Sequence, residues 1–158
     1  MSGDIVELIA GWPGARWLRA SGLAYPFVNA THILGIGLLL GAILPLDLRL
    51  LGFFNAVPLR VIGPFLSRAA AVGAGLAVLT GLWLFSVQPG DYFGNPAFRW
   101  KAGLLVLAIV NIVAQHLGKQ YRVAVGGGRI GTIVRVHAAL SVVLWLSVLV
   151  AGRWIGFV

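Results

Sequence analysis

The sequence predicts an all-α integral membrane protein, a bundle of four transmembrane helices preceded by a short interfacial segment. Three observations predict this fold. Of the 158 residues, 59% are hydrophobic. Only 10% are charged, whereas an ordinary soluble domain has about 25%. The mean hydropathy is +0.96, and turn-forming residues divide the apolar sequence into four stretches that are each long enough to cross a bilayer.

Residues 1–158 are expected to form one transmembrane domain whose N-terminal segment, residues 1–23, lies at the membrane interface. Asp4 and Glu7 stand where a signal peptide would be basic, and Trp12-Pro13-Gly14 interrupts any short apolar core. The spans are expected at about 25–54, 61–87, 97–121 and 132–157.

Proline and glycine set the boundaries of these spans. Pro58 precedes the second span, and Gln88-Pro89-Gly90-Asp91 ends it. Asn95-Pro96 opens the third span, and Gly126-Gly127-Gly128 makes a flexible turn before the fourth. The third and fourth spans are expected to be hairpin neighbours in a compact four-helix membrane bundle.

Lysine and arginine near the helix ends predict the orientation. Seven basic residues fall on the first and third connections: Arg49, Arg60, Arg68, Lys119, Arg122, Arg129 and Arg135. Five fall on the opposite side: Arg16, Arg19, Arg99, Lys101 and Arg153. Because basic residues favour the cytoplasmic side, we expect the first and third connections inside and both termini outside. The dispersed basic residues fit the lipid bilayer as partner and not nucleic acid.

Small residues predict where the helices pack. Ala69, Gly73, Ala77 and Gly81 recur every four residues on the second span. Gly37 and Gly41 form a GxxxG pattern on the first span. Such patterns let helix backbones approach closely, which is a main source of helix association in lipid.

The sulfur content limits the cofactors. The absence of cysteine excludes disulfides, iron–sulfur clusters and covalent c-type haem. Met1 is the only methionine, so a His/Met haem is not expected. Any iron or copper must take imidazole, carboxylate, tyrosine or water as ligands, and attention falls on the three histidines.

His116 and His137 are the most suggestive pair. Each is expected about five residues from the turn that joins the third and fourth spans, so the two imidazoles should lie at similar depth. Two such histidines are typical of a bis-imidazole haem b site in a membrane bundle, and Arg122 and Arg135 would meet the propionates. Directly packed helices are only about 8–10 Å apart, so a haem needs a splayed hairpin or ligands from diagonal helices. The alternative is that both histidines reach the headgroups without a ligand.

Three further polar residues lie on the first span. His32 lies deeper in apolar surroundings and fits either an outer haem or metal ligand, or a histidine bonded to a backbone carbonyl. Asp47 and Arg49 lie near the inner end and fit either a propionate or quinone anchor, or a role in orientation and packing at the interface. The fourth span carries His137, Ser141 and Trp145 on one face, which suits interhelical hydrogen bonds or a cofactor pocket.

Two stretches carry a resemblance to a known family. They are His32-Ile33-Leu34-Gly35 with Asp47-Leu48-Arg49-Leu50-Leu51-Gly52, and Leu140-Ser141 through Leu144-Trp145 to Gly152-Arg153-Trp154-Ile155. With Phe98-Arg99-Trp100-Lys101, they resemble an uncharacterised family of small bacterial four-helix membrane proteins. The family pattern emphasises the positions of His32 and His116. More loosely, the layout resembles cytochrome b561-like and copper-resistance-D-like bundles, a resemblance that implies inward histidines binding haem or copper.

The leading functional hypothesis is a haem-b-binding protein that transfers electrons within the membrane, to a quinone or to a partner subunit, and not a stand-alone enzyme. The first alternative is transport of copper or another cation, with His32 at one face and His116 and His137 at the other. The absence of internal sulfur ligands argues against Cu(I). The second alternative is a non-catalytic subunit of a larger membrane complex or homo-oligomer, which would use the small-residue stripe for packing.

Overall fold

In the computed structural model, residues 2–158 are described, with side chains from Asp4 onward, and these residues contain helices and no strand. Four helices are long and apolar enough to cross a membrane: α3 (Ala24–Leu51), α4 (Leu59–Phe85), α6 (Pro96–Leu117) and α8 (Thr132–Trp154). The predicted all-α fold is confirmed, and the chain is a multi-pass membrane protein.

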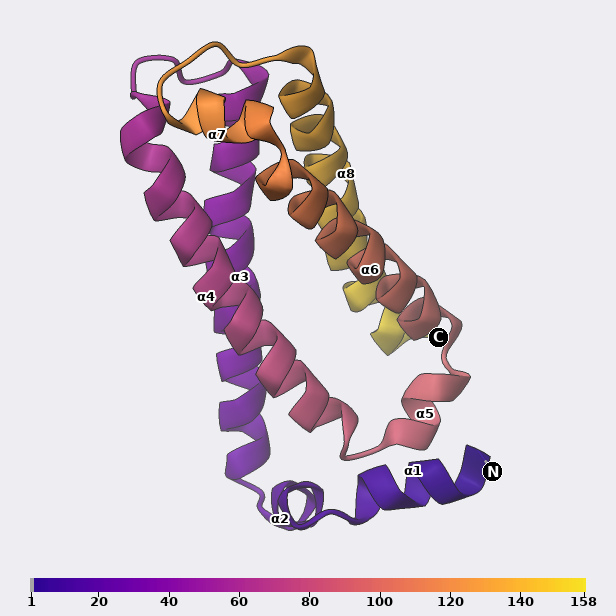
Figure 1. Cartoon of the computed structure of the whole chain (residues 1–158). Coiled ribbons are helices and arrows are strands. Elements are labelled where there is room, and N and C mark those ends of the chain that lie inside the picture. The colour runs from indigo at the N-terminus through magenta and orange to yellow at the C-terminus, as the bar shows by residue number, and fades with distance from the viewer. Residues whose placement is uncertain (1) are drawn as a thin grey trace.

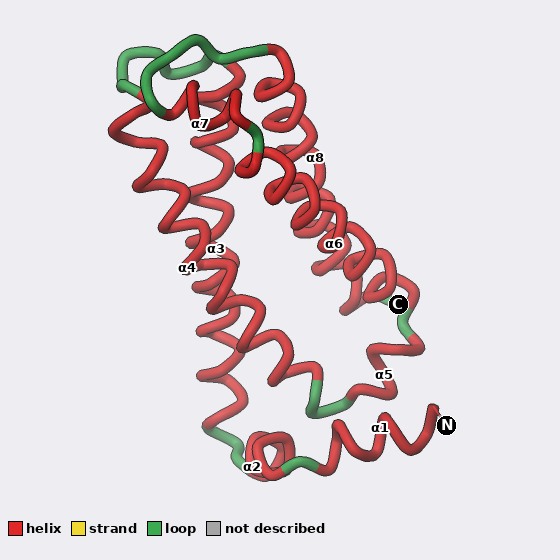
Figure 2. Tube along the Cα trace, in the orientation of Figure 1, coloured by secondary structure: helices red, strands yellow, loops and turns green. Residues whose placement is uncertain are grey.

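The four long helices form two pairs that diverge from one end. α3 packs along α4, α6 packs along α8, and α3 also contacts α8 (Figure 1). The short helix α7 (Lys119–Val125) lies across the end where the pairs meet. At the other end, α1 (Ser2–Gly11), α2 (Pro13–Ala20) and α5 (Pro89–Gly94) lie across the open side, and both termini are found there (Figure 2). We call these the α7 end and the α2 end.

The backbones of helices α3 and α4 approach each other closely at glycine residues. A methyl group built on Gly73 would lie 2.4 Å from the Leu39 nitrogen, and one built on Gly35 would lie 2.7 Å from the Ala77 nitrogen. The small-residue stripe predicted on the second span is therefore confirmed at Gly73. The prediction for the first span was wrong in detail, because Gly37 and Gly41 have nothing within 4 Å of such a methyl group. Gly35, which starts no GxxxG pattern, makes the close approach instead.

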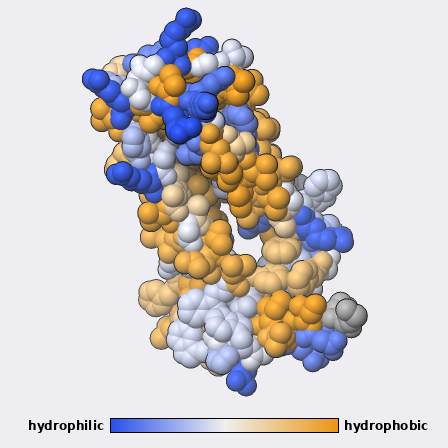
Figure 3. All heavy atoms as spheres, viewed as in Figure 1, coloured by the Kyte–Doolittle hydropathy of each residue, from blue (hydrophilic) through white to orange (hydrophobic). Residues whose placement is uncertain are grey.

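The main apolar core lies near the α7 end. Leu46 and Leu50 of α3 are buried there, together with Ala108 of α6 and Ala138 of α8. Outside this core, most large apolar side chains are exposed, as a protein surrounded by lipid acyl chains requires. Figure 3 shows apolar side chains along the flanks and hydrophilic side chains gathered at the α7 end.

The N-terminal helices are tied to the end of α4. The Trp83 indole donates to the Gly14 carbonyl at 3.0 Å, and the Trp12 indole donates to Ser86 Oγ at 2.9 Å. Arg19 donates to the Val87 carbonyl at 2.7 Å. These helices lie across the bundle end, and the interfacial position predicted for residues 1–23 stays a prediction; Met1 lies outside the described residues.

The third long helix is shorter than expected. α6 ends at Leu117 and Gly118 leaves the helical conformation, with φ −66° and ψ 130°. The chain then turns into α7, where the sequence predicts a continuous span to about residue 121. Gly126 and Gly127, the latter at φ 98°, lead out of α7 toward α8. Because α6 ends early, His116 lies one residue before the end of its helix and not about five.

Candidate functional site

In each of the three histidines, the ring nitrogen Nδ1 takes part in a hydrogen bond. His116 Nδ1 lies 2.9 Å from the Ile112 carbonyl oxygen, which only accepts. Asn111 donates through Nδ2 to the His137 carbonyl at 3.0 Å, so its Oδ1 accepts from His137 Nδ1 at 2.7 Å. Both rings therefore donate from Nδ1 and, when neutral, carry the lone pair on Nε2. This tautomer is the one that offers Nε2 as a metal ligand.

His32 is held in the same tautomer by Thr80 of α4. Thr80 Oγ1 donates its one proton to the Leu76 carbonyl at 2.6 Å. The hydroxyl oxygen therefore accepts from His32 Nδ1, which lies 3.1 Å away. A methyl group on Gly81 would lie 2.9 Å from His32 Cε1, so this glycine makes room for the ring. His32 is half-buried eight residues into α3, about 12 Å along the helix axis.

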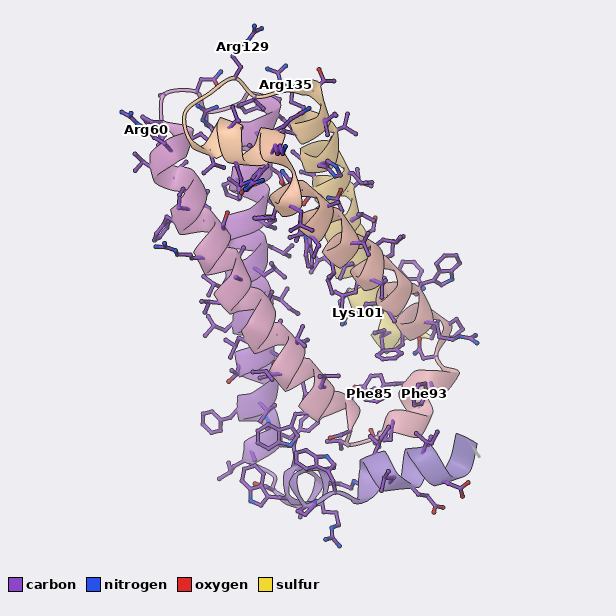
Figure 4. All side chains as sticks on the ribbon, in the orientation of Figure 1. Arg60, Phe85, Phe93, Lys101, Arg129 and Arg135 are labelled. Carbon is purple, nitrogen blue, oxygen red and sulfur yellow. The ribbon has the colours of Figure 1, made fainter. Side chains whose placement is uncertain are left out.

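Lys101 of α6 lies near His32, although the sequence places it with the rim charges. Its charge acts on the His32 imidazole, and its side chain runs along α8, where a methyl group on Gly152 would lie 3.5 Å from Nζ. Lys101 has no acidic partner among the residues that the structure describes. Figure 4 shows Lys101 directed into the space between α4 and α6, and Figure 3 shows this space open between the two helix pairs. Lys101 therefore points toward the space between the two helix pairs, whereas the His32 ring lies against Thr80 and Gly81 of α4.

His116 and His137 are placed differently from each other. His116 is exposed one residue before the end of α6, and its ring packs against Tyr121 with centroids 4.5 Å apart. His137 is half-buried and faces Asn111, five residues before His116. Five residues turn the helix by roughly 140°. The two histidines therefore leave α6 and α8 in different directions and have separate partners. The premise of equal distance from the turn was wrong because α6 ends before residue 121.

The remaining predicted site residues lie at the α7 end. Arg122 and Arg135 are exposed on α7 and α8, and Figure 4 shows Arg135 at the rim with Arg60 and Arg129. Arg49 donates to the Val57 carbonyl at 3.0 Å and to Asn55 Oδ1 at 2.9 Å, so it holds the loop that follows α3. Arg49 also borders a cavity of about 250 Å³ with Arg60 and the glycines of the turn after α7.

Asp47 occupies the core, whereas its position near the helix end suggests the boundary. Its side chain is 1% exposed and lies beside Ser141 of α8. Tyr121 of α7 is near enough to Asp47 for an electrostatic interaction between the two side chains. Burial raises the pKa of Tyr121 above that of a free tyrosine, a hydrogen bond with Ser67 at 3.1 Å opposes the increase, and Asp47 adds to it.

Sequence reasoning missed two residues of the His32 site, Thr80 and Lys101. Thr80 carried a detectable signal, because it is a hydroxyl residue within an apolar helix, one residue before Gly81 of the small-residue stripe. Lys101 carried a weaker one, since lysine near a helix end normally reaches the headgroups. No group of three or more histidine, aspartate and glutamate side chains gathers among the described residues in a way that would hold a metal ion.

Comparisons with known proteins give no family for this chain. No protein-family model, no curated protein and no solved structure matches it. The function is therefore argued from the site alone.

Proposed function

We propose that the protein binds haem b between its two helix pairs and transfers electrons within the membrane. The observation that carries the proposal is His32, a membrane-embedded imidazole whose Nδ1 is fixed by Thr80, so that Nε2 is available as an axial ligand. The Thr80 hydroxyl orients the ring, and Gly81 makes room for it. His32 takes precedence over the His116 and His137 pair, because those two rings have separate partners on different sides of α6.

Lys101 supplies the second element of the site. A haem carries two propionates, and a lysine without an acidic partner inside a membrane bundle is a suitable counter-charge for one of them. Lys101 lies close enough to act on His32. We propose that the haem enters between α4 and α6, because these two helices do not pack along each other.

Bound haem would supply one-electron chemistry at a potential set by its axial ligand and its burial. The chain would orient the ligand through Thr80, exclude water with the apolar walls of α3 and α4, and neutralise a propionate with Lys101. We further propose that the protein resides in a bacterial inner membrane with both termini periplasmic. Seven basic residues lie toward the α7 end, against Arg16, Arg19, Arg99 and Arg153 toward the α2 end, and this excess supports the orientation. A membrane quinone or a partner subunit would then exchange the electron.

The test is an optical titration of the purified protein with haemin in mild detergent, followed by reduction with dithionite. We expect a b-type reduced spectrum at one haem per chain. His32→Ala should weaken haem binding at least about tenfold, which corresponds to about 1.4 kcal/mol. His116→Ala and His137→Ala serve as matched controls and should retain the spectrum. A wild-type protein that stays colourless in the presence of haemin would refute the proposal.

A further inference from the structure

The cavity beside Arg49 is bordered by two arginine side chains and by glycine backbone. It has a volume of about 250 Å³ and lies at the α7 end, where the loop between α3 and α4 meets the turn between α7 and α8 (Figure 1). Arg49 and Arg60 line it from the first segment, and Gly127 and Gly128 line it from the second. Segments far apart in the sequence therefore converge on one space.

The two glycines keep their part of the wall free of side chains. Gly127 has φ 98°, a conformation that favours glycine, and a methyl group built on it would lie 3.9 Å from Arg60 Cδ. A methyl group on Gly128 would lie 2.6 Å from Val123 Cγ1 and 3.0 Å from the Val123 carbonyl oxygen. A ligand in the cavity can therefore lie against backbone while it contacts Arg60.

The two arginines differ in how they are held. Arg49 donates through Nε to the Val57 carbonyl and through Nη1 to Asn55 Oδ1, and these bonds leave Nη2 for a ligand. Arg60, the second residue of α4, is exposed. One guanidinium group is thus fixed by its loop, and the other can adjust to what enters.

No exposed carboxylate neutralises these arginines among the described residues of the α7 end. Asp4 and Glu7 belong to α1 and Asp91 to α5, all at the α2 end. The fourth acidic residue, Asp47, is 1% exposed and lies in the core. Two guanidinium groups at one cavity without an acidic partner favour an anion. Phosphate is the anion whose oxygens best match the paired donors of arginine.

The position of the cavity indicates where the phosphate comes from. Arg49 lies two residues before the end of α3, so both arginines are found at the ends of membrane-spanning helices, at the level of the lipid headgroups. In the same loop, Phe53 and Phe54 are 59% and 68% exposed, as is typical of side chains that enter the membrane interface. The cavity is smaller than the roughly 300–1,000 Å³ pockets that enclose whole ligands, so it suits a headgroup whose acyl chains remain outside.

We propose that this cavity binds the phosphate of an anionic membrane phospholipid, between Nη2 of Arg49 and the guanidinium group of Arg60. The acyl chains lie beside Phe53 and Phe54. Basic pockets at the ends of transmembrane helices are suited to such headgroups. The bound lipid connects the loop after α3 to the turn before α8, and so holds the two helix pairs together where they meet. This lipid site is separate from the His32 site, and its test does not require haem.

The experiment is native mass spectrometry of the full-length protein in mild detergent, titrated with phosphatidylglycerol or with phosphatidylcholine of the same acyl chains. We expect the first phosphatidylglycerol to bind at least about tenfold more tightly than the first phosphatidylcholine. Arg60→Gln should weaken the binding of phosphatidylglycerol by at least about tenfold. Arg60→Lys keeps the charge but loses the planar donor group, so it should weaken binding by a smaller factor.

Arg129→Gln is the matched control. It removes the same charge from the same end of the bundle, but Arg129 does not line the cavity, and Figure 4 shows it directed away from the helices. At physiological ionic strength this variant should change the affinity for phosphatidylglycerol by less than about twofold.

Three results would overturn the proposal. Equal losses in Arg60→Gln and Arg129→Gln would mean that the lipid responds to the charge of the α7 end and not to the cavity. Equal affinities for phosphatidylglycerol and phosphatidylcholine would mean that the cavity does not select an anionic lipid. Inorganic phosphate that binds as tightly as phosphatidylglycerol, and depends equally on Arg60, would mean that the site takes free phosphate and not a lipid.

Discussion

Between α3 and α4 the two backbones touch across glycines, whereas between α6 and α8 an asparagine–histidine pair spans the interface. Gly35 and Gly73 leave no room for a methyl group on either α3 or α4. On α6, Gly103 has nothing within 4 Å of such a group, and Asn111 instead makes two hydrogen bonds to His137. Close backbone packing fixes the spacing of α3 and α4, and thereby the position of His32 against Thr80. Side-chain hydrogen bonds determine which faces of α6 and α8 meet.

The largest effect should follow from adding one methyl group between α3 and α4. Gly73→Ala places a Cβ 2.4 Å from the Leu39 nitrogen, where backbone must move to relieve the overlap. We expect a loss of about 3 kcal/mol in the free energy of unfolding. The matched control is Gly41→Ala on α3, whose methyl group meets nothing and should stabilise its helix by up to about 1 kcal/mol. Chemical unfolding in detergent, monitored by circular dichroism, measures the change in free energy of unfolding for both variants. Equal changes for Gly73→Ala and Gly41→Ala would contradict the close backbone contact at Gly73.

A smaller effect is expected between α6 and α8. Asn111→Leu removes two hydrogen bonds to His137, each worth about 0.6 kcal/mol in a membrane bundle, for a total of about 1 kcal/mol. A double-mutant cycle with His137→Ala isolates the bond between the side chains, because the bond to the His137 carbonyl survives that change. We expect a coupling energy of about 0.6 kcal/mol. A coupling of zero would mean that the pair does not hold the two helices together.

The first and last residues of each span can be predicted closely from the sequence, but the direction in which each side chain points cannot. The four spans begin and end within a few residues of their expected positions, because Pro58, Pro96 and the glycine turns act locally. Asp47 and Lys101 were assigned to the membrane boundary because each lies near a helix end. Their side chains instead face the core and the opening, and which face of a helix points inward depends on the neighbouring helices.

The candidate site was predictable only in part for the same reason. His32 stood out as an ionisable group within an apolar span. Thr80 and Lys101 lie 48 and 69 residues away from it in sequence. No local pattern connects them. The His116 and His137 pairing depended on a hairpin turn that the break at Gly118 replaces with α7.

The smallest effect at neutral pH concerns α7, which joins the two pairs. Tyr121→Phe loses the hydrogen bond to Ser67, so we expect a cost of about 0.6 kcal/mol at pH 7. The pKa of Tyr121 is raised chiefly by burial, so the unfolded chain releases this proton first, at about pH 10. The stability that the buried phenol contributes is therefore present below about pH 10 and is lost as the pH rises through the higher folded-state pKa.

A measurement of stability at alkaline pH must separate the contribution of Tyr121 from that of Tyr92, which lies at the α2 end. Burial also raises the pKa of Tyr92, with Tyr25 and Asp91 adding to the increase, so the measurement is made in a Tyr92→Phe background. In this background, the free energy of unfolding of the protein with Tyr121 should fall above pH 10. The difference in free energy of unfolding between this protein and the one that also carries Tyr121→Phe should therefore narrow. A constant difference between pH 7 and strongly alkaline pH would show that Tyr121 is not buried against α4.

The most direct test of the account is the electron paramagnetic resonance spectrum of the ferric haem complex, recorded for the wild type and for the three histidine variants. A single axial imidazole from His32 predicts a high-spin signal that His32→Ala abolishes and that His116→Ala and His137→Ala leave unchanged. A low-spin signal that disappears in both His116→Ala and His137→Ala would contradict the account, because it would place the haem between those two histidines and not between the two helix pairs at His32.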